Sequence, residues 1–288
     1  MTTEEMHHDD HDLGLSHDLP RIIEQGVARR RLFGILGGLS AAAVVAGCGA
    51  GEDASTSGTT SSTGGGPGSS PGRSTGTAVA DGEIPEETAG PYPGDGSNGK
   101  NVLNQTGVVR SDIRSSFGGA TGVAEGVPLT IRLKVYDLTG ETTQSLPGAA
   151  VYLWHCDRDG RYSMYDSEIA EENYLRGVQE ADDDGWVEFT SIFPAAYDGR
   201  WPHIHFEVYG SVDDATNASN KLRTSQLAFP KDTCEAVYAT SGYEASVNNL
   251  ARTSLNTDMV FSDGYSLQLA KMTGSVSKGY VATLNVPV

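Results

Sequence analysis

The chain is 288 residues long and contains 36 Gly, nearly twice the usual share of about 7%. This length allows one or two domains, and the surplus of Gly indicates that part of the chain does not pack into a core. The formal net charge is −18 at pH 7. This charge excludes nucleic acid as a partner, because a protein that phosphate repels gains no affinity from released counterions.

A basic and then an apolar segment near the start are typical of an export signal. Arg29–Arg31 precede an apolar run at residues 32–46, which is too short to span a bilayer. The arginines with Phe33 resemble a twin-arginine signal, and Val-Ala-Gly before Cys48 resembles a bacterial lipobox. We therefore expect residues 1–47 to be an export signal, Cys48 to be lipidated, and the protein to be a cell-surface lipoprotein or extracellular.

The next segment has the composition of a tether. Of the 32 residues at positions 49–80, 24 are Gly, Ser, Thr or Pro. Such a segment cannot bury enough apolar surface to offset the entropy of ordering it. We interpret residues 48–80 as the lipidated Cys and a flexible tether, and we expect contact with the membrane only through this N-terminal lipid anchor.

Residues 81–288 are long enough for one domain with its own core, and they show mostly strand patterns. Alternating or short apolar runs occupy residues 129–135, 149–154, 186–189, 203–208 and 280–286. Turn signals separate them at the spacing of a sandwich rather than of βαβ units. We predict an all-β, antiparallel β-sandwich with long loops, with weak helical patterns only at residues 167–176 and 231–239.

The motif His203-Ile204-His205 is the first candidate for chemistry. Side chains alternate along a strand, so both imidazoles are expected on one face and Ile204 on the other. Two neighbouring imidazoles are half of a metal site. A polar strand face without a metal is the other interpretation, and the motif alone does not separate the two.

Several ordered motifs resemble the intradiol ring-cleavage dioxygenases, relatives of the catechol and protocatechuate dioxygenases. The resemblance extends from about residue 84 to about residue 238. The segments that carry it are residues 88–92, 151–162, 189–197, 199–205 and 224–230. In that family the long loops of a β-sandwich carry the metal site.

The resemblance implies a mononuclear non-haem Fe(III) held by Tyr162, Tyr197, His203 and His205. Tyrosinate is a hard anionic donor that stabilises ferric iron, and neutral imidazoles complete the ligand set. It also implies that Tyr197 leaves the iron as a base when the substrate binds. The same metal site would explain why two Tyr and two His occur in this order.

The resemblance assigns roles to three further residues. Arg200 would contact the substrate and stabilise developing negative charge, although a plain ion pair with a nearby acid is its other interpretation. Gln226 matches a catalytic-site glutamine near the iron, and Tyr92 matches a residue that lines the substrate pocket.

The implied reaction is cleavage of a catechol-type ring between its two hydroxyl-bearing carbons by O2, giving a cis,cis-muconate-type diacid. The expected partners are thus a small aromatic diol and O2. The alternative is a non-catalytic β-sandwich binding module of the transthyretin-like or carbohydrate-binding kind. The four ordered ligands and Arg200 favour the enzyme, because a binding module has no need to keep them together.

The remaining His and Cys residues carry weaker signals. His155 matches no ligand motif, and we expect it to be packed and hydrogen-bonded. Cys156 and Cys234 could form a disulfide in an oxidising exterior or remain two buried thiols. A zinc site that combines them with the two imidazoles lacks a Cys-x-x-Cys motif and leaves the tyrosines unexplained.

Overall fold

A computed structural model describes residues 82–138 and 143–288. The predicted export signal, Cys48 and the tether lie outside these residues, so their roles stay predictions. Within the described ranges, no helix combines the length and the apolar character needed to cross a membrane.

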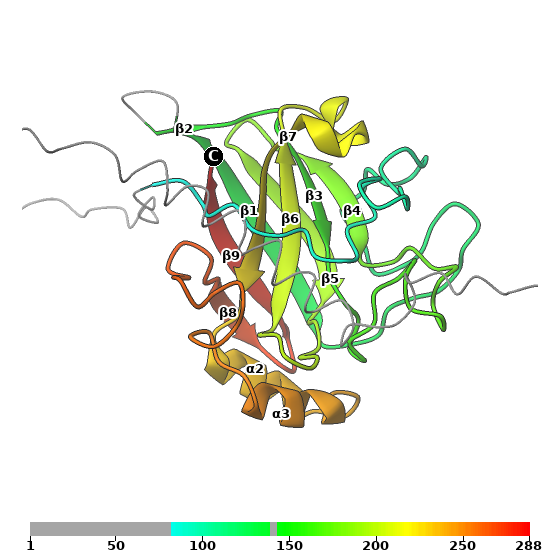
Figure 1. The fold of residues 1–288 in the computed structure, drawn as a ribbon, viewed down its shortest axis with the longest axis vertical. Helices are drawn as coiled ribbons and strands as arrows, with labels where there is room; N and C mark the ends of the chain where they lie inside the picture. The colour runs from blue at the N-terminus through cyan, green and yellow to red at the C-terminus, as the bar shows by residue number, and fades with distance from the viewer. Residues whose placement is uncertain (1–81, 139–142) are drawn as a thin grey trace, which may run out of the picture. The chain divides into compact units, whose positions relative to one another are not determined.

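Strands make up most of the regular secondary structure in the described chain, and they form two sheets (Figure 1). The strands of the first sheet are β1 (Pro128–Asp137), β2 (Gln144–Ser145), β5 (Trp186–Ile192), β8 (Lys271–Ser275) and β9 (Gly279–Pro287). The second sheet has the order β4-β3-β6-β7 and is antiparallel throughout. Its strands are β3 (Ala150–Trp154), β4 (Arg176–Glu180), β6 (His203–Tyr209) and β7 (Lys221–Ala228).

The first sheet is mixed, which corrects the prediction of a purely antiparallel fold. β1 pairs antiparallel with β2 and β5 but parallel with β9, from Leu129 opposite Tyr280 to Tyr136 opposite Pro287. Parallel neighbours need a long connection, and here all the chain between β1 and β9 provides it. Alternation within one strand predicts the strand and its faces but carries no information about the direction of a distant partner.

One apolar core contains side chains from both sheets. Leu133 of β1 and Phe189 of β5 belong to the same buried cluster as Leu153 of β3, Ile204 of β6 and Leu227 of β7. Because side chains alternate along a strand, the neighbours of Ile204 face the other side of the second sheet. His203 and His205 therefore point away from the shared core.

The segment before β1 covers this outer face of the second sheet. Figure 1 shows it crossing in front of β6. Its backbone is tied to both sheets: the Ile84 N–H donates to the Pro287 carbonyl at 2.8 Å, and the Glu87 N–H donates to the Thr224 carbonyl at 2.8 Å. Residues 88–94, the covering segment, are thus held over the histidines of β6.

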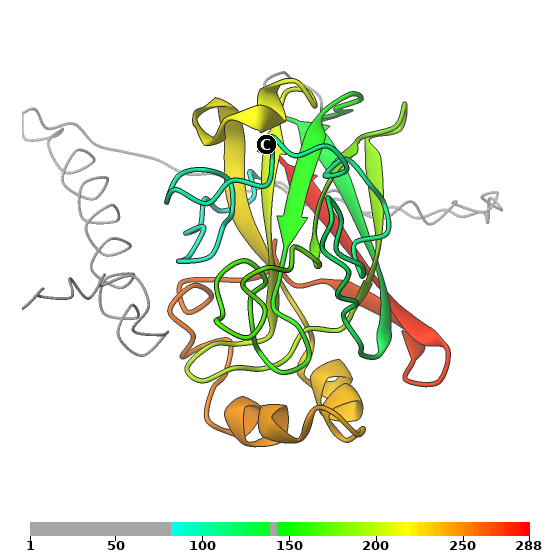
Figure 2. The same cartoon turned by 90° about the vertical axis from the view of Figure 1, so that its right-hand side faces the viewer.

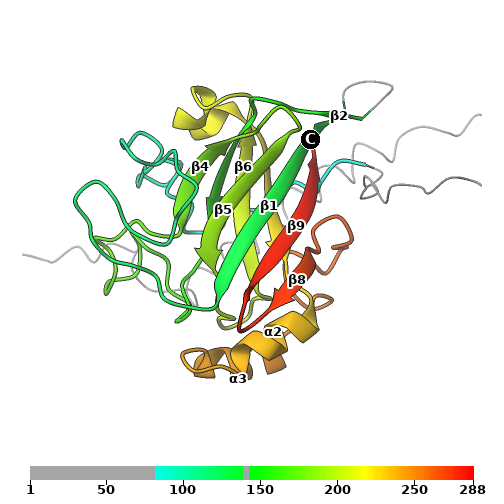
Figure 3. The ribbon, with the colours of Figure 1, turned by 180° about the vertical axis from the view of Figure 1, so that it is seen from behind.

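Two helices, α2 (Lys231–Tyr238) and α3 (Glu244–Ala251), lie together at one end of the sheets (Figures 2 and 3). α2 confirms the helical pattern at residues 231–239. It begins directly after Pro230 and buries Cys234, Val237 and Tyr238. Two short 3-10 turns, η2 (Asp214–Thr216) and η3 (Ala218–Asn220), precede β7.

The weak helix expected at residues 167–176 is not formed, and that prediction is wrong. Residues 167–171 form turns, residues 172–175 are irregular, and β4 begins at Arg176. The Asn173 side chain accepts from the Phe117 N–H at 2.8 Å and donates to the Phe117 carbonyl at 3.0 Å. Leu175 has a φ of 56°, in the left-handed region, which a right-handed helix cannot contain.

Candidate metal centre

Four side chains form a cross-strand row on the outer face of the second sheet. Arg176 on β4 is opposite Trp154 on β3, Trp154 is opposite His205 on β6, and His205 is opposite Gln226 on β7. Residues directly opposite each other on paired strands share a face. His203 lies on the same face at the start of β6, where the loops that precede β6 and follow β3 meet.

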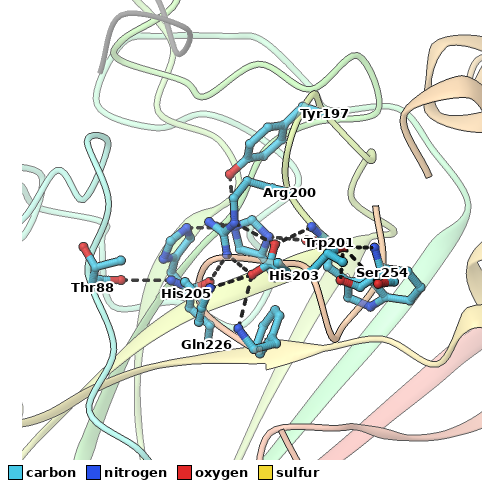
Figure 4. Close-up of polar contacts among 12 residues, drawn as sticks. Thr88, Tyr197, Arg200, Trp201, His203, His205, Gln226 and Ser254 are labelled. Atoms are coloured by element: carbon cyan, nitrogen blue, oxygen red, sulfur yellow. Dashed lines mark hydrogen bonds and ion pairs between the residues drawn. The ribbon is translucent and has the colours of Figure 1, made fainter. Parts of the chain in front are cut away.

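Two loops bring the predicted tyrosines to these histidines. The Tyr162 Oη lies 3.3 Å from the Tyr197 Oη. The Tyr197 Oη in turn lies 3.1 Å from the His203 Nε2 (Figure 4). The Nε2 atoms of His203 and His205 are 3.1 Å apart. The structure thus brings together all four residues that the resemblance names as ligands.

The donor atoms of this cluster fit a metal ion. The Nδ1–H of His203 donates to the Trp201 carbonyl at 2.5 Å. This bond leaves a lone pair on Nε2 and fixes the orientation of the ring, as hydrogen bonds to the other nitrogen of a metal-binding imidazole do. Two ligand atoms bound at about 2.1 Å to one ion are themselves about 3 Å apart. The spacing of the four donor atoms therefore suits ligands of a single ion.

Burial sets the protonation of the four side chains. It lowers the pKa of His203 and of His205 well below 6.5, with further lowering by the Arg200 charge and, for His205, by His203. Burial raises the pKa of both the Tyr162 and the Tyr197 phenols. The imidazoles are therefore neutral and ready to bind a metal, while the phenols need a nearby cation to lose their protons.

Arg200 lies beside the imidazoles and is held there by Asp258. Its Nε donates to Asp258 at 2.9 Å, and one terminal nitrogen lies 3.3 Å from the His203 Nε2. The other terminal nitrogen donates to the Gln226 side-chain oxygen at 2.7 Å (Figure 4). The sequence allowed two interpretations of Arg200, an ion pair with a nearby acid and a position at the site. The structure shows both, because Arg200 pairs with Asp258 and lies beside His203.

Asp258 is a residue that sequence reasoning missed. It is fully buried, and besides Arg200 it accepts from the Trp201 N–H at 2.7 Å and the Val260 N–H at 2.8 Å. It follows α3 and is one of 38 acidic residues, without a motif around it. No pattern along the chain could have distinguished it.

Gln226 and Tyr92 both lie at the site. The Gln226 amide donates to the Thr88 carbonyl at 2.9 Å, so it joins β7 to the covering segment (Figure 4). The Tyr92 ring lies 5.0 Å from the Tyr162 ring, between centroids. The covering segment therefore adds an aromatic wall beside Tyr162.

His155 has the packed, hydrogen-bonded environment that we expected. It is buried, with its ring nitrogens 2.7 Å from the Cys156 carbonyl and 2.7 Å from the Ser191 hydroxyl. Burial lowers its pKa from 6.5 to about 4. Its two ring nitrogens are both used in these contacts, away from the cluster of four donors.

The disulfide that the sequence left open is not formed. Cys156 and Cys234 are buried free thiols in separate apolar clusters, Cys156 in the cluster that contains Trp154 and Cys234 in the core shared by the sheets. No three His, Cys, Asp or Glu side chains of the described ranges gather closely enough to hold a metal ion. A metal bound by His203 and His205 would therefore depend on tyrosine for further protein ligands.

The family model described as Dioxygenase matches residues 112–269, more than half of the chain. A catechol 1,2-dioxygenase from Pseudomonas sp. (strain EST1001) is 33% identical to this chain over 73 residues. The chain belongs to the intradiol ring-cleavage dioxygenase family. Its matched region includes the two tyrosines, the two histidines, Arg200 and Asp258.

The similarity to curated intradiol dioxygenases is local. The Pseudomonas match covers 25% of this chain and 23% of the relative. A chlorocatechol 1,2-dioxygenase from Rhodococcus opacus is 29% identical over 85 residues, which are 30% of this chain and 26% of the relative. The matched segments thus span about a quarter of each relative.

The fold is shared more widely within the family. An intradiol ring-cleavage dioxygenase from Tetranychus urticae superposes with a TM-score of 0.51 at 24% identity, over 62% of this chain and 86% of that one. At this identity the comparison concerns the fold. The two chains thus share the arrangement of the mixed and the antiparallel sheet over the superposed region.

Proposed function

We propose that this protein is a mononuclear non-haem Fe(III) dioxygenase that uses O2 to cleave a catechol-type ring between its two hydroxyl-bearing carbons. The product would be a cis,cis-muconate-type diacid. The observation that supports this proposal most strongly is the close approach of two phenol oxygens and two imidazole nitrogens. Along the series Tyr162, Tyr197, His203 and His205, each of these atoms lies within 3.3 Å of the next. Family membership and this donor set support the same function.

Tyr162, Tyr197, His203 and His205 would hold the iron. Two anionic phenolates and two neutral imidazoles favour the ferric ion. Bound there, Fe(III) would orient and polarise an aromatic diol for attack by O2. The low pKa values of the buried imidazoles keep both rings neutral, as ligation requires.

The two tyrosines have different surroundings, which suits different roles. Tyr162 is buried, whereas Tyr197 is partly exposed and lies between Tyr162 and His203. Tyr197 can therefore move with less loss of packing. We assign to Tyr197 the role of the base that takes a proton from the diol. We assign to Tyr162 the role of the ligand that stays on the iron.

Arg200 would stabilise the negative charge that develops on the diol. Its guanidinium is fixed on two sides, by Asp258 and by Gln226, and it directs one nitrogen to the imidazole of His203. A fixed charge at a buried site acts on a reacting group without reorganising. The Tyr92 ring beside Tyr162 would line the space for a flat aromatic substrate.

The architecture and location belong to the same proposal. We infer that the two sheets form a β-sandwich, since one apolar cluster contains side chains from both. Residues 81–288 would be the catalytic domain. From the motifs in residues 1–80 we propose that the enzyme is exported and attached to the membrane by a lipid on Cys48.

The Tyr162→Phe variant tests the proposed function. After loading with Fe(III), the wild-type protein should show a red-brown charge-transfer band and consume O2 with catechol at an oxygen electrode. Tyr162→Phe should lose most of the band and of the O2 uptake. Tyr280→Phe, which removes a partly buried phenol on β9, should keep both. A wild-type protein that stays colourless and binds no iron would overturn the proposal.

A further inference from the structure

Arg176 is a buried cation whose hydrogen bonds go only to neutral groups. It is 1% exposed, and no acid of the described ranges forms an ion pair with it. Its Nε donates to the Ser163 hydroxyl at 3.1 Å, and its Nη2 donates to the Ser163 carbonyl at 2.9 Å. Burying an arginine without a paired acid is costly, so a purely structural site would be better filled by an apolar side chain.

The same guanidinium reaches two more segments. It donates to the Tyr92 carbonyl at 3.0 Å, to the Pro93 carbonyl at 2.9 Å and to the Tyr152 hydroxyl at 3.1 Å. It therefore joins the covering segment, the loop after β3 and β3 itself. Only the planar guanidinium, with five N–H groups, can serve so many acceptors at once.

Each joined segment carries or supports a residue of the proposed centre. Ser163 directly follows Tyr162, and the ring of Tyr92 lies 5.0 Å from that of Tyr162. Tyr152 stacks on Trp154 with centroids 5.0 Å apart, and Trp154 stacks on His205. The guanidinium is thus bonded to the residue next to Tyr162. Two successive ring contacts, Tyr152 on Trp154 and Trp154 on His205, connect it to a second proposed iron ligand.

The backbone around Arg176 adopts unusual conformations. Met164, directly after Ser163, has a φ of 73°, and Leu175, directly before Arg176, has a φ of 56°. In the described ranges these are the non-Gly residues with positive φ, and such strain persists where the surrounding contacts determine the conformation. A Cβ on Gly94 would lie 2.8 Å from Arg176 Nη1, so the covering segment also approaches too closely for a side chain.

We propose that Arg176 is a positioning residue for the proposed reaction, which holds the Tyr162 phenol and the Tyr92 wall in one arrangement. This inference rests on the proposed function. Without the guanidinium, the loop after β3 and the covering segment lose their common donor. The Tyr162 phenolate would then occupy a wider range of positions beside the iron. The Tyr92 ring would likewise occupy a wider range of positions beside the bound diol.

The Arg176→Met variant tests this role, because it keeps an unbranched side chain and removes every donor. We expect the visible band of the Fe(III)-loaded protein to shift and broaden, and the KM for catechol to rise about tenfold with a smaller change in kcat. In the metal-free protein, amide hydrogen exchange should quicken at Tyr92, at Gly94 and at residues 162–166, and stay unchanged in β9. Arg176→Lys should recover only part of these properties.

Two further variants separate positioning from stability. Ser163→Ala removes one acceptor of Arg176 and should shift the same properties less, so it carries the test if Arg176→Met does not fold. Val286→Ala creates a cavity in the core of the first sheet and should lower the melting temperature while leaving the band and the KM unchanged.

The outcomes distinguish this inference from the proposed function. A coloured, active wild type whose Arg176→Met form keeps the same band, KM and exchange rates would overturn the role of Arg176 alone. The same result follows if Val286→Ala changes the band and the KM as Arg176→Met does. A wild type that binds no iron would instead overturn the proposed function.

Discussion

The indole of Trp154 lies flat on the imidazole of His205, with ring centroids 4.9 Å apart and planes 6° apart. A metal-binding imidazole usually gives its other nitrogen to a hydrogen-bond partner, as His203 does with the Trp201 carbonyl. The Nδ1 of His205 is buried and has no such partner. The stacked indole therefore supports the orientation of this ring where a hydrogen bond to Nδ1 is missing.

Replacing Trp154 should weaken metal binding. Trp154→Leu removes the flat surface under His205, and we expect about a tenfold loss in iron affinity, in the range for lost supporting contacts at metal sites. Trp154→Phe keeps a ring and should lose less. Competition with an iron chelator measures the affinity. Trp186→Leu, on β5 of the other sheet, is the matched control, and an equal loss there would contradict the prediction.

Removing the negative charge of Asp258 should strongly destabilise the protein. Asp258→Asn leaves the buried Arg200 guanidinium without its counter-charge, which costs about 3–5 kcal/mol of unfolding free energy. Asp112 forms an exposed ion pair with Arg114 at 2.7 Å, so Asp112→Asn should cost less than about 1 kcal/mol. Urea unfolding of both variants tests the difference, and equal shifts would refute the role of Asp258.

The stability that the buried, neutral His155 contributes to the metal-free protein should be lost as the pH drops from about 6.5 towards 4. Burial lowers the pKa of His155 to about 4, so the unfolded chain takes up this proton before the folded protein does. The contribution of His155 to the free energy of unfolding is complete above about pH 6.5 and is lost as the pH falls from about 6.5 to about 4. The full loss is about 3 kcal/mol.

Comparison with His155→Asn isolates this effect, because His203 and His205 titrate in the same direction in both proteins. The unfolding free energy of His155→Asn should depend less steeply on pH, by up to about 1.4 kcal/mol per pH unit. Denaturant unfolding at several pH values between 4 and 7 measures the two slopes. Parallel curves would show that His155 does not carry the dependence.

A methyl group on Gly90 should disturb the proposed iron site. Gly90 has a φ of 72°, and a Cβ there would meet the His205 ring at 3.4 Å. Gly148 has a φ of 77° and open space around it. Both Gly→Ala variants carry a similar backbone cost of about 1 kcal/mol. Only Gly90→Ala should shift the visible band of the iron-loaded protein, and a shift in Gly148→Ala as well would assign the effect to backbone strain.

Local patterns were sufficient for much of the fold. Alternation of apolar residues predicted β1, β3, β5, β6 and β9 close to their observed bounds, and Pro230 marked the start of α2. The pattern did not reveal β4, whose start at Arg176 lay inside the wrongly expected helix. The position of Arg176 depends on hydrogen bonds from its guanidinium to residues far away in the chain, such as Tyr92 and Pro93. Such contacts produce no periodic pattern in the local sequence.

By itself, the sequence determined which side chains could serve a metal and which strand presents them. The alternation in His203-Ile204-His205 places both imidazoles on one face in any extended strand, because successive side chains point to opposite sides. The tertiary structure places the hydroxyls of Tyr162 and Tyr197 beside them, as the family resemblance implied. It alone decided that Asp258 holds Arg200 and that β9 lies parallel to β1. These contacts join residues distant in the chain, and their energy depends on burial and on atoms meeting at about 3 Å, neither of which a linear pattern contains.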